Sequence, residues 1–565
     1  MNYKKELAEI LHQLLEGEKS AEELEMLIEK PKNAGHGDLA FPCFTLAKLK
    51  RKAPNLIAQE LSEKIQSPTF EKIEVVGAYL NVFLNKQAVA EKIINDILTQ
   101  KEQFGSQNMG QGGNVTIDLS SPNIAKPFSM GHLRSTVIGN AIALIVEKCG
   151  YQPIKINHLG DWGTQFGKLI TAYKLWGDAD KVKANPISEL LALYVKFHEE
   201  AETNHALEDD GRAWFKKLED GDEEAVELWQ WFRDESLKEF ARIYDLLNVD
   251  FDSLAGESFY NDKMDRVVNL LEEKGLLVES NQAQVVELTE EELPPCLIKK
   301  SDGATLYATR DLAAALYRKE TYNFVKSLYV VGHEQSLHFK QLIAVLKKMG
   351  FEWAGDMAHI PFGMMLTGGK KMSTRKGKVV LLEEVLKESI EMARHNIEEK
   401  NPALANKDEV AKQVGVGAVI FHDLKNNRMN DIEFSLEELI RFEGETGPYV
   451  QYTFARACSI LRKANWQPEA APQNFTATTW EKEWKVVSFL MEFPNAIKRA
   501  CENFDPSQVA KYVVDLAQVF NKYYAEVRIL EESEEQAARL ALVYAVTQVL
   551  KEGLRLLSIQ APEEM

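Results

Sequence analysis

The stretch from Asn114 to Gly150 constrains the fold of this chain more than any other part of the sequence. Apolar and polar residues alternate over 115–119, which predicts a half-buried strand, and residues 120–122 are turn formers that end it. Beyond Gly131, apolar residues recur at helical spacing up to Gly150, a residue type that commonly ends helices. The stretch therefore predicts a strand, a polar loop and a long helix, in this order.

The loop before this helix is suited to binding an anion. The first turn of a helix leaves backbone N–H groups free, and the helix dipole places partial positive charge there. Gly131 lets a ligand approach the backbone, His132 supplies a hydrogen-bond donor, and Lys126 supplies a fixed positive charge. These features favour a nucleotide-phosphate site, although many helices begin with a Gly-His pair and bind nothing.

A second segment, residues 359–378, predicts a strand followed by a loop rich in glycine and lysine, with a helix beyond it. Together the two segments resemble the paired signatures of class I aminoacyl-tRNA synthetases. The HxGH signature corresponds to residues 129–132 and the KMSKS signature to residues 371–375. Both depart from the pattern, because Ser129 replaces the first histidine and Thr374 replaces the second lysine.

Longer segments narrow the resemblance to arginyl-tRNA synthetases of the bacterial type. The similar segments are SSPNIAKPFSMGHLRST, NHLGDWGTQFG, LYATRDLAAALYR, YVVGHEQSLHFKQL and GPYVQYTFARACSILRK. The resemblance runs from about residue 35 to the end of the chain. This family is known for a degenerate second signature, for which a lysine ahead of HxGH is thought to compensate. Lys126 stands at that position.

The resemblance implies a multidomain fold that combines α/β and all-α parts. We expect an N-terminal α/β appended tRNA-binding domain over 1–110, a class I Rossmann-like catalytic domain with a parallel sheet over 111–385, and a helix-bundle domain for stem contact and anticodon binding over 386–565. Strands and helices alternate after residue 114, as a parallel sheet requires. Long acidic helices interrupt this alternation and predict an insertion around 176–300.

The family's reaction has two steps. ATP activates L-arginine as an arginyl-adenylate, and tRNA(Arg) then accepts the arginyl group. The resemblance assigns catalytic roles to Lys126, His132 and Lys371, and ATP binding to Ser129, Gly131, His132, Gly160, Lys371, Met372 and Ser373. Mg²⁺ is expected to arrive with ATP as part of the substrate.

No protein-bound metal cofactor is expected. The five cysteines contain no CxxC pair, which disfavours both a disulfide framework and a zinc site. His333 and His338 are one residue too far apart for the HExxH zinc motif.

Recognition of arginine requires anions and a planar set of acceptors for the guanidinium group. Tyr307 and Asp311 are four residues apart and would share one face of a helix. The resemblance places these two residues and Glu257 against the substrate side chain, and Asn123 and Gln335 at its α-amino and carboxylate end. Asp311 has a structural alternative, since it could pair with the nearby Arg310 or Arg318.

The resemblance also predicts contacts to tRNA at both ends of the chain. The resemblance implies that Tyr79 and Asn81 are the nucleotide-contacting pair of the appended domain. An aromatic plane beside an amide would suit an unstacked base. Tyr449, Tyr452 and Arg456 are the expected contacts in the anticodon-binding part. The tyrosines also have an alternative role, because aromatic residues at strand or helix spacing commonly belong to a core.

The formal net charge of −19 disfavours indiscriminate binding to phosphate. Local basic patches can still hold one structured RNA while acidic faces repel others. The sequence contains no run of about 18 apolar residues that could span a membrane, and its N-terminal segment lacks the apolar core of a signal peptide. We therefore expect a cytoplasmic monomer that acts on tRNA(Arg), L-arginine and ATP and has no membrane partner.

Two other functions remain open from the sequence. Ser129 and Thr374 are compatible with a catalytically inactive tRNA-binding relative, although such a protein would need no arginine pocket. A class I synthetase for another amino acid is disfavoured by the acidic pocket residues.

Overall fold

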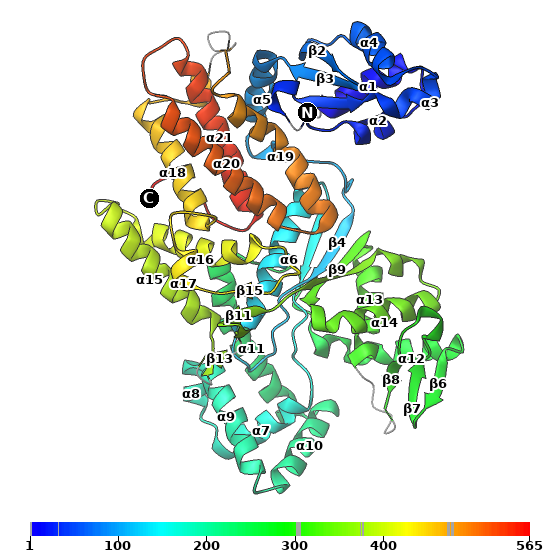
Figure 1. The fold of residues 1–565 in the computed structure, drawn as a ribbon. Coiled ribbons are helices and arrows are strands. Elements are labelled where there is room, and N and C mark those ends of the chain that lie inside the picture. Colours follow the sequence, from blue (N-terminus) through cyan, green and yellow to red (C-terminus); the bar gives the residue numbers. More distant parts are fainter. Residues whose placement is uncertain are drawn as a thin grey trace. The chain divides into compact units, whose positions relative to one another are not determined.

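The computed structural model describes residues 3–31, 33–300, 307–372, 374–375, 378–471, 475 and 479–565. Ser373, one of the predicted ATP-binding residues, lies outside the described residues, as does the side chain of Lys371. The chain divides into two compact units. The first contains residues 1–104, 457–493 and 518–549, and the second contains residues 105–456, 494–517 and 550–565. Figure 1 shows the elements in chain order.

A parallel four-stranded sheet with the order β10-β9-β4-β5 forms the centre of the second unit (Figure 1). Its strands are β4 (Asn114–Asp118), β5 (Gln152–Ile156), β9 (Lys326–Gly332) and β10 (Met357–Phe362). From β4 the chain crosses to β5 in one direction along the sheet, and from β9 it crosses to β10 in the opposite direction. The connections thus reverse direction between β4 and β9, and in such sheets ligands bind beyond the carboxyl ends of the strands at this switch point. The predicted parallel sheet is confirmed.

Helix α6 (Met130–Lys148) connects β4 to β5 and is buried on nearly all sides, as expected for a helix that is apolar all round. The backbone N–H of Ser120, just after β4, donates to Ser135 Oγ at 2.9 Å, and this hydroxyl donates to the carbonyl of Val330 in β9 at 2.7 Å. These bonds place the N-terminus of α6 at the carboxyl edge of the sheet.

A helical insertion follows β5, as predicted. After α7 (Thr164–Trp176), the predicted range around 176–300 begins with α8 (Ala179–Ala184), α9 (Pro186–Ala201), α10 (Ala206–Glu219) and α11 (Glu223–Leu247). The same stretch also contains an antiparallel sheet that the sequence analysis did not predict: β6 (Leu277–Ser280), β7 (Ala283–Val286) and β8 (Cys296–Lys299). Strands of four residues carry too little periodic pattern to be recognised from sequence alone.

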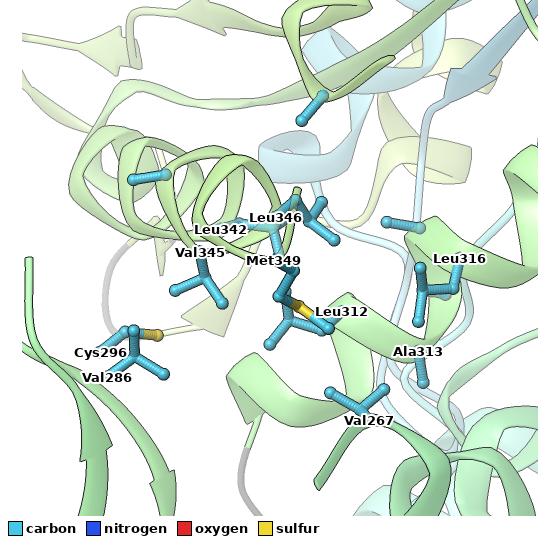
Figure 2. Close-up of a cluster of buried hydrophobic side chains, with 14 of the residues drawn as sticks. Val267, Val286, Cys296, Leu312, Ala313, Leu316, Leu342, Val345, Leu346 and Met349 are labelled. Atoms are coloured by element: carbon cyan, nitrogen blue, oxygen red, sulfur yellow. The ribbon is translucent and has the colours of Figure 1, made fainter. Parts of the chain in front are cut away.

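A buried hydrophobic cluster fixes the helix that carries the predicted arginine contacts. Figure 2 shows side chains from α12 (Met264–Glu273), α13 (Tyr307–Tyr322) and α14 (Ser336–Lys348) packed together with residues of β7 and β8. Leu312 and Leu316 lie one turn apart on α13 and both belong to this cluster. At the start of α13, Thr309 Oγ1 donates to the carbonyl of Ile298 at 2.6 Å. The face of α13 that carries Tyr307 and Asp311 is therefore held in a defined orientation.

The second signature begins in a small sheet with the order β12-β11-β15. Its strands are β11 (Met365–Thr367), β12 (Lys370–Lys371) and β15 (Ile432–Glu433), and a separate hairpin of β13 (Thr374–Arg375) and β14 (Lys378–Val379) follows β12. Helix α15 (Leu382–Lys400) comes next, so the expected domain boundary at residue 385 falls inside a helix.

Beyond α15, the regular elements among the described residues are helices, as predicted, apart from β15. Its helices are α16 (Lys407–Leu424), α17 (Leu436–Leu439), α18 (Gly447–Lys463), α19 (Trp484–Asn503), α20 (Ser507–Glu526) and α21 (Gln536–Leu556).

The N-terminal part of the first unit has the expected α/β composition. Its helices are α1 (Tyr3–Leu14), α2 (Ala21–Leu27), α3 (Ala47–Lys50), α4 (Pro54–Lys64) and α5 (Lys86–Gln100). They accompany an antiparallel sheet of β1 (Leu39–Pro42), β3 (Tyr79–Leu84) and β2 (Phe70–Val76), in which β3 is central. A two-residue turn joins β2 to β3, and Gly77 adopts the positive φ of 62° that its first position requires.

Candidate active site

The loops after β4 and β5 run side by side at the carboxyl edge of the sheet. Asn123 and Gly160 form an isolated parallel bridge, with Ile124 N–H bonded to the carbonyl of Gly160 at 3.1 Å and Gly160 N–H bonded to the carbonyl of Pro122 at 3.1 Å. A Cβ atom on Gly160 would lie 2.1 Å from Asn123 Oδ1, so a larger residue there would force the Asn123 side chain to move. Asn123 and Lys126 are both exposed on the loop that this packing supports.

His132 lies in the first turn of α6 and its ring is held by the backbone. The N–H of Ser129, the N-cap residue, donates to His132 Nδ1 at 3.1 Å. Since Nδ1 accepts, the proton of the neutral imidazole is assigned to Nε2. Burial lowers the pKa of His132 and the charge of Lys126 lowers it further, while a backbone contact with Ser129 opposes them. The arrangement offers Nε2–H as a neutral donor beside the helix N-terminus.

The two signatures lie next to each other. Met130 N–H donates to the carbonyl of Val380 at 3.1 Å, and Leu382 N–H donates to the carbonyl of Phe128 at 3.0 Å. The segment that follows the second signature is thus bound to the start of α6. Met372 is buried and its N–H donates to the carbonyl of Met365 at 2.7 Å, which makes it an anchor of the β11–β12 hairpin.

Two histidines lie beside Asp311, and one of them is within hydrogen-bond distance. His338 Nε2 lies 2.6 Å from Asp311 Oδ2, and His158 Nε2 lies 3.8 Å from Asp311 Oδ1. The ring of Tyr307 packs 4.9 Å from the His338 ring, and the Asp311 charge raises the pKa of Tyr307. Tyr307, Asp311 and the two histidines therefore form one cluster.

The structural alternative for Asp311, a pair with Arg310 or Arg318, is wrong for the described part of the chain. Arg318 donates to Asp118 Oδ2 at 2.9 Å at the end of β4, and both side chains are buried. Arg310 donates to Asn261 Oδ1 at 3.2 Å. Neither arginine neutralises the Asp311 carboxylate.

Glu257 is the second acid of the pocket. It begins the 3₁₀ helix η4 (Glu257–Lys263), and its N–H donates to the carbonyl of Leu159, next to Gly160, at 2.9 Å. Burial raises the pKa of Glu257 to about 7, helped by the charges of Asp311 and Asp161 and opposed by Arg310. Asp311 and Asp161 thus both lie close enough to Glu257 for their charges to disfavour its ionised form.

Only one of these three acids is paired with an arginine among the described residues. Asp161 is fully buried, lies 3.0 Å from Arg233 Nε, and accepts from the N–H and hydroxyl of Ser258 at 2.8 and 2.9 Å. Neither Glu257 nor Asp311 forms an ion pair with a lysine or arginine in the described part of the chain, although the charge of Arg310 lies close enough to Glu257 to lower its pKa. A guanidinium group entering between them would relieve their repulsion and satisfy both.

Gln335 occupies the carboxyl end of β9, in the 3₁₀ helix η6 (His333–Gln335), and is exposed. The structure therefore places it on the same edge of the sheet as the Asn123 loop. Gly131, in the first turn of α6, is also exposed.

Sequence reasoning missed the roles of His158 and His338. His158 lies in the quoted segment NHLGDWGTQFG, is 9% exposed, and its buried Nε2 has no hydrogen-bond partner. In the sequence, His338 stands out only through its spacing from His333, which does not fit a zinc motif. No local signal shows that either ring faces an aspartate that is distant in sequence.

The predicted tRNA contacts of the N-terminal domain are not presented together. Tyr79 is partly exposed and packs edge-on against Phe44 at 5.9 Å. Asn81 is 3% exposed, so its amide is not presented to a base, which corrects the expectation for this residue. The reason is its place in the central strand, where Ala40 of β1 and Glu74 of β2 flank it.

Tyr452 belongs to a cluster of aromatic and basic side chains. The guanidinium carbon of Arg456 lies 4.9 Å from the Tyr452 ring, and Lys400 Nζ lies 4.2 Å from the Phe442 ring and 5.6 Å from the Tyr452 ring. Tyr449 is partly buried one turn earlier in α18. Aromatic planes interleaved with cations suit unstacked bases and their phosphates. Lys400 and Phe442 had no recognisable signal in the sequence.

An apolar pocket of about 650 Å³ adjoins Glu257, since Gly256 and Ser258 are among its lining residues. The other lining residues include Trp162, Trp229 and Phe259. Within the described ranges, no group of three or more metal-ligating side chains could hold a metal ion. Among the helices described, none is long and apolar enough to cross a bilayer.

Comparison with known proteins agrees with these features over the whole chain. Residues 93–436 match the family of class I tRNA synthetases (R), catalytic domain. Residues 450–565 match the DALR anticodon binding domain, and residues 1–84 match the arginyl tRNA synthetase N-terminal domain.

Individual proteins give the same picture. The chain is 64% identical to the arginine–tRNA ligase of Enterococcus faecalis and 61% identical to that of an Exiguobacterium species, each over 565 residues and 100% of both chains. The solved arginyl-tRNA synthetase of Thermus thermophilus superposes with a TM-score of 0.81 at 28% identity, covering 100% of both chains. That of Plasmodium falciparum superposes with a TM-score of 0.82 at 25% identity, covering 100% of this chain and 99% of the other. The chain therefore belongs to the arginyl-tRNA synthetase family of class I aminoacyl-tRNA synthetases, as its motifs predicted.

Proposed function

We propose that the carboxyl edge of the central sheet is where this synthetase attaches L-arginine to tRNA(Arg), with ATP as the energy source and an arginyl-adenylate as intermediate. One observation carries the assignment: Glu257 and Asp311 both border the loop after β5, through Leu159 and His158 respectively, and neither forms an ion pair with an arginine in the described part of the chain. A free arginine supplies the missing cation. The fixed donor His132 stands beside a helix N-terminus at the same edge of the sheet.

In the first step the arginine carboxylate attacks the α-phosphate of ATP and pyrophosphate leaves. His132 Nε2–H and the N-terminus of α6 donate to phosphate oxygens as their charge develops, which typically contributes on the order of 10²–10³ in rate per donor. Lys126 and Lys371 supply positive charge. Ser129 orients His132, and Gly131 leaves room for the nucleotide. Mg²⁺ accompanies the triphosphate as part of the substrate and shields its charge.

For the amino acid, Glu257 and Asp311 accept from the guanidinium group, which is suited to bidentate recognition by carboxylates. Tyr307 forms a wall of the pocket. Asn123 and Gln335 hold the α-amino and carboxylate end, and Gly160 lets the Asn123 loop pack as it does. An uncharged or shorter side chain would leave the buried acids unpaired, so the pocket discriminates by roughly 10⁴ or more.

In the second step a terminal ribose hydroxyl of tRNA takes the arginyl group from the adenylate. The aromatic pocket beside Glu257 suits the adjoining base, since indole and phenyl rings stack on bases. Tyr79, Tyr449, Tyr452 and Arg456 are the proposed contacts farther along the tRNA, with Lys400 and Phe442 added by the structure. Asn81 could contribute only after a rearrangement that exposes its amide.

The proposed division of labour follows the expected domains. Residues 1–110 and 386–565 bind tRNA, and residues 111–385 carry out the chemistry. The proposed state is a cytoplasmic monomer, because the predicted activity needs one set of site residues from one chain and acts where tRNA is used.

The test is arginine-dependent ATP–pyrophosphate exchange, measured with and without tRNA, for the wild type and for Asp311→Asn. The substitution keeps the shape of the side chain and removes its charge. We expect the KM for arginine to rise at least tenfold, which corresponds to the roughly 1.5–3 kcal/mol of a charged hydrogen bond. Asp262→Asn is the matched control, since Asp262 lies on the same 3₁₀ helix as Glu257 and is exposed.

An unchanged KM in Asp311→Asn would contradict the assignment of the arginine pocket. Absence of exchange in the wild type under both conditions, with tRNA binding intact, would instead favour the catalytically inactive relative. Exchange only with tRNA present would show that tRNA completes the site.

A further inference from the structure

One buried side chain, Arg134, bonds the first turns of α6 to the segments beneath the second signature. It lies two residues after His132 and is 1% exposed. Its Nε lies 3.1 Å from Asp423 Oδ2 on α16, and this carboxylate is also buried. The remaining guanidinium nitrogens donate to three backbone carbonyls, those of Gly363 at 2.8 Å, Asn430 at 2.8 Å and Arg428 at 3.3 Å.

These three carbonyls lie directly before the two strands that carry the hairpin of the second signature. Gly363 precedes β11, and the other two residues precede β15, which pairs in parallel with β11. Two backbone bonds join the same segments, Gly363 N–H to the carbonyl of Arg428 and Ile432 N–H to the carbonyl of Met364, each at 2.9 Å. Strand β11 also pairs with β12, which contains Lys371.

The hairpin is also bonded to β15, because Phe434 N–H donates to the carbonyl of Leu366 at 2.9 Å and Gly369 N–H donates to the Glu433 carboxylate at 3.3 Å. These bonds lie within the two segments that Arg134 joins to α6. Strands β11 and β15 contain three and two residues, and β12 contains two. Beyond the loop, Val380 and Leu382 are bonded to Met130 and Phe128 at the start of α6. The basic loop is thus attached to the same helix at both ends, at its beginning through Arg134 and at its end through backbone bonds.

We propose that Arg134 is a positioning residue for the ATP site, which sets the distance between His132 and the lysine of the second signature. This inference rests on the proposed roles of His132 and Lys371. A planar fork of five donors can hold a carboxylate and three carbonyls at once, which the single ammonium of lysine cannot do. Arg134 itself does not touch the substrate.

A purely structural role of the Arg134–Asp423 ion pair predicts that all variants of the pair damage the ATP kinetics alike, whereas a positioning role does not. Three variants of this pair separate the two roles. Asp423→Asn removes the charge partner but leaves the three carbonyl bonds of Arg134 in place. Arg134→Lys weakens the ion pair and also loses the carbonyl bonds. The double variant Arg134→Met with Asp423→Leu removes both charges, which commonly preserves a fold better than leaving one buried charge alone.

The experiment measures tRNA-dependent ATP–pyrophosphate exchange and the melting temperature of the full chain. For Arg134→Lys and for the double variant we expect kcat/KM for ATP to fall on the order of 10²-fold, as for a misplacement of about 1 Å. The KM for arginine should stay within about twofold. Asp423→Asn should lower the melting temperature yet keep the ATP kinetics near those of the wild type.

The decisive measurement is a double-mutant cycle that combines the Arg134 variant with Lys371→Gln. If Arg134 acts through Lys371, the combined variant loses little more than the worse single variant, because the two residues then act as a unit. Three outcomes would overturn the inference and leave the proposed function intact. The first is a combined variant whose fall in kcat/KM for ATP is the product of the two single falls. The others are wild-type ATP kinetics in a folded Arg134 variant, and equal kinetic damage in Asp423→Asn. If Lys371→Gln alone leaves the ATP kinetics unchanged, the proposed role of Lys371 is overturned, and the inference with it.

Discussion

Glu257 is the residue whose charge state most directly governs the affinity for arginine. Burial and two neighbouring acids raise its pKa to about 7, so a substantial fraction is neutral near neutral pH in the empty site. A guanidinium group favours the ionised form, and binding of arginine should therefore lower the pKa of this carboxyl group. The protonation state of Glu257 and the occupancy of the site are linked.

The prediction at this scale concerns pH. Below pH 7 the neutral carboxyl form predominates, so kcat/KM for arginine should fall by about tenfold for each pH unit on the acid side, since this ratio reports groups of the free enzyme. Raising the pH above 7 should bring a plateau. In Glu257→Gln the ratio should be low and lack this acid limb. If kcat/KM for arginine in Glu257→Gln still falls on the acid side with the same midpoint, the titrating group is another residue.

Among the elements, those with strong local periodicity could be predicted from the sequence. The alternation before residue 120 and the helical spacing after Gly131 correctly indicated β4 and α6, because both are long enough to show their period. The partners of Asp311 could not be predicted, since His158 and His338 approach it only through packing of distant segments. Asn81 shows the same limit, because alternation along β3 does not reveal what covers the strand.

Gly160 permits a test of how two loops jointly form the arginine site. In Gly160→Ala the added Cβ would come within 2.1 Å of Asn123 Oδ1, so the Asn123 amide would have to leave the position proposed for binding the substrate. We expect a lower melting temperature and a KM for arginine raised about tenfold, with a smaller effect on the KM for ATP. Gly355→Ala is the matched control, because a Cβ there meets nothing within 4 Å. Equal kinetic effects of both variants would show that Gly160 has no specific role.

At the scale of the whole molecule, an acidic protein must bind a polyanion. With a formal net charge of −19, long-range attraction to tRNA is weak, so affinity must come from local groups such as Lys400 and Tyr452. Lys400→Ala should raise the KM for tRNA and reduce the slope of log affinity against log salt by about 1. Tyr452→Ala should cost about 1–3 kcal/mol with little change in that slope, since stacking releases no counterion.

Lys387→Ala separates a local contact from a change in net charge. Lys387 lies on the same helix as Lys400, is exposed, and pairs with Glu383 at 2.8 Å. Both lysine variants alter the net charge equally, so a cluster that contacts phosphate predicts a change of salt slope only for Lys400→Ala. Pyrophosphate exchange at saturating tRNA should be unaffected in either variant, because neither lysine is among the residues proposed to bind ATP or arginine. Equal slopes of log affinity against log salt for the two lysine variants would mean that tRNA binding depends on the overall charge of the protein. In that case the cluster around Tyr452 does not bind the tRNA.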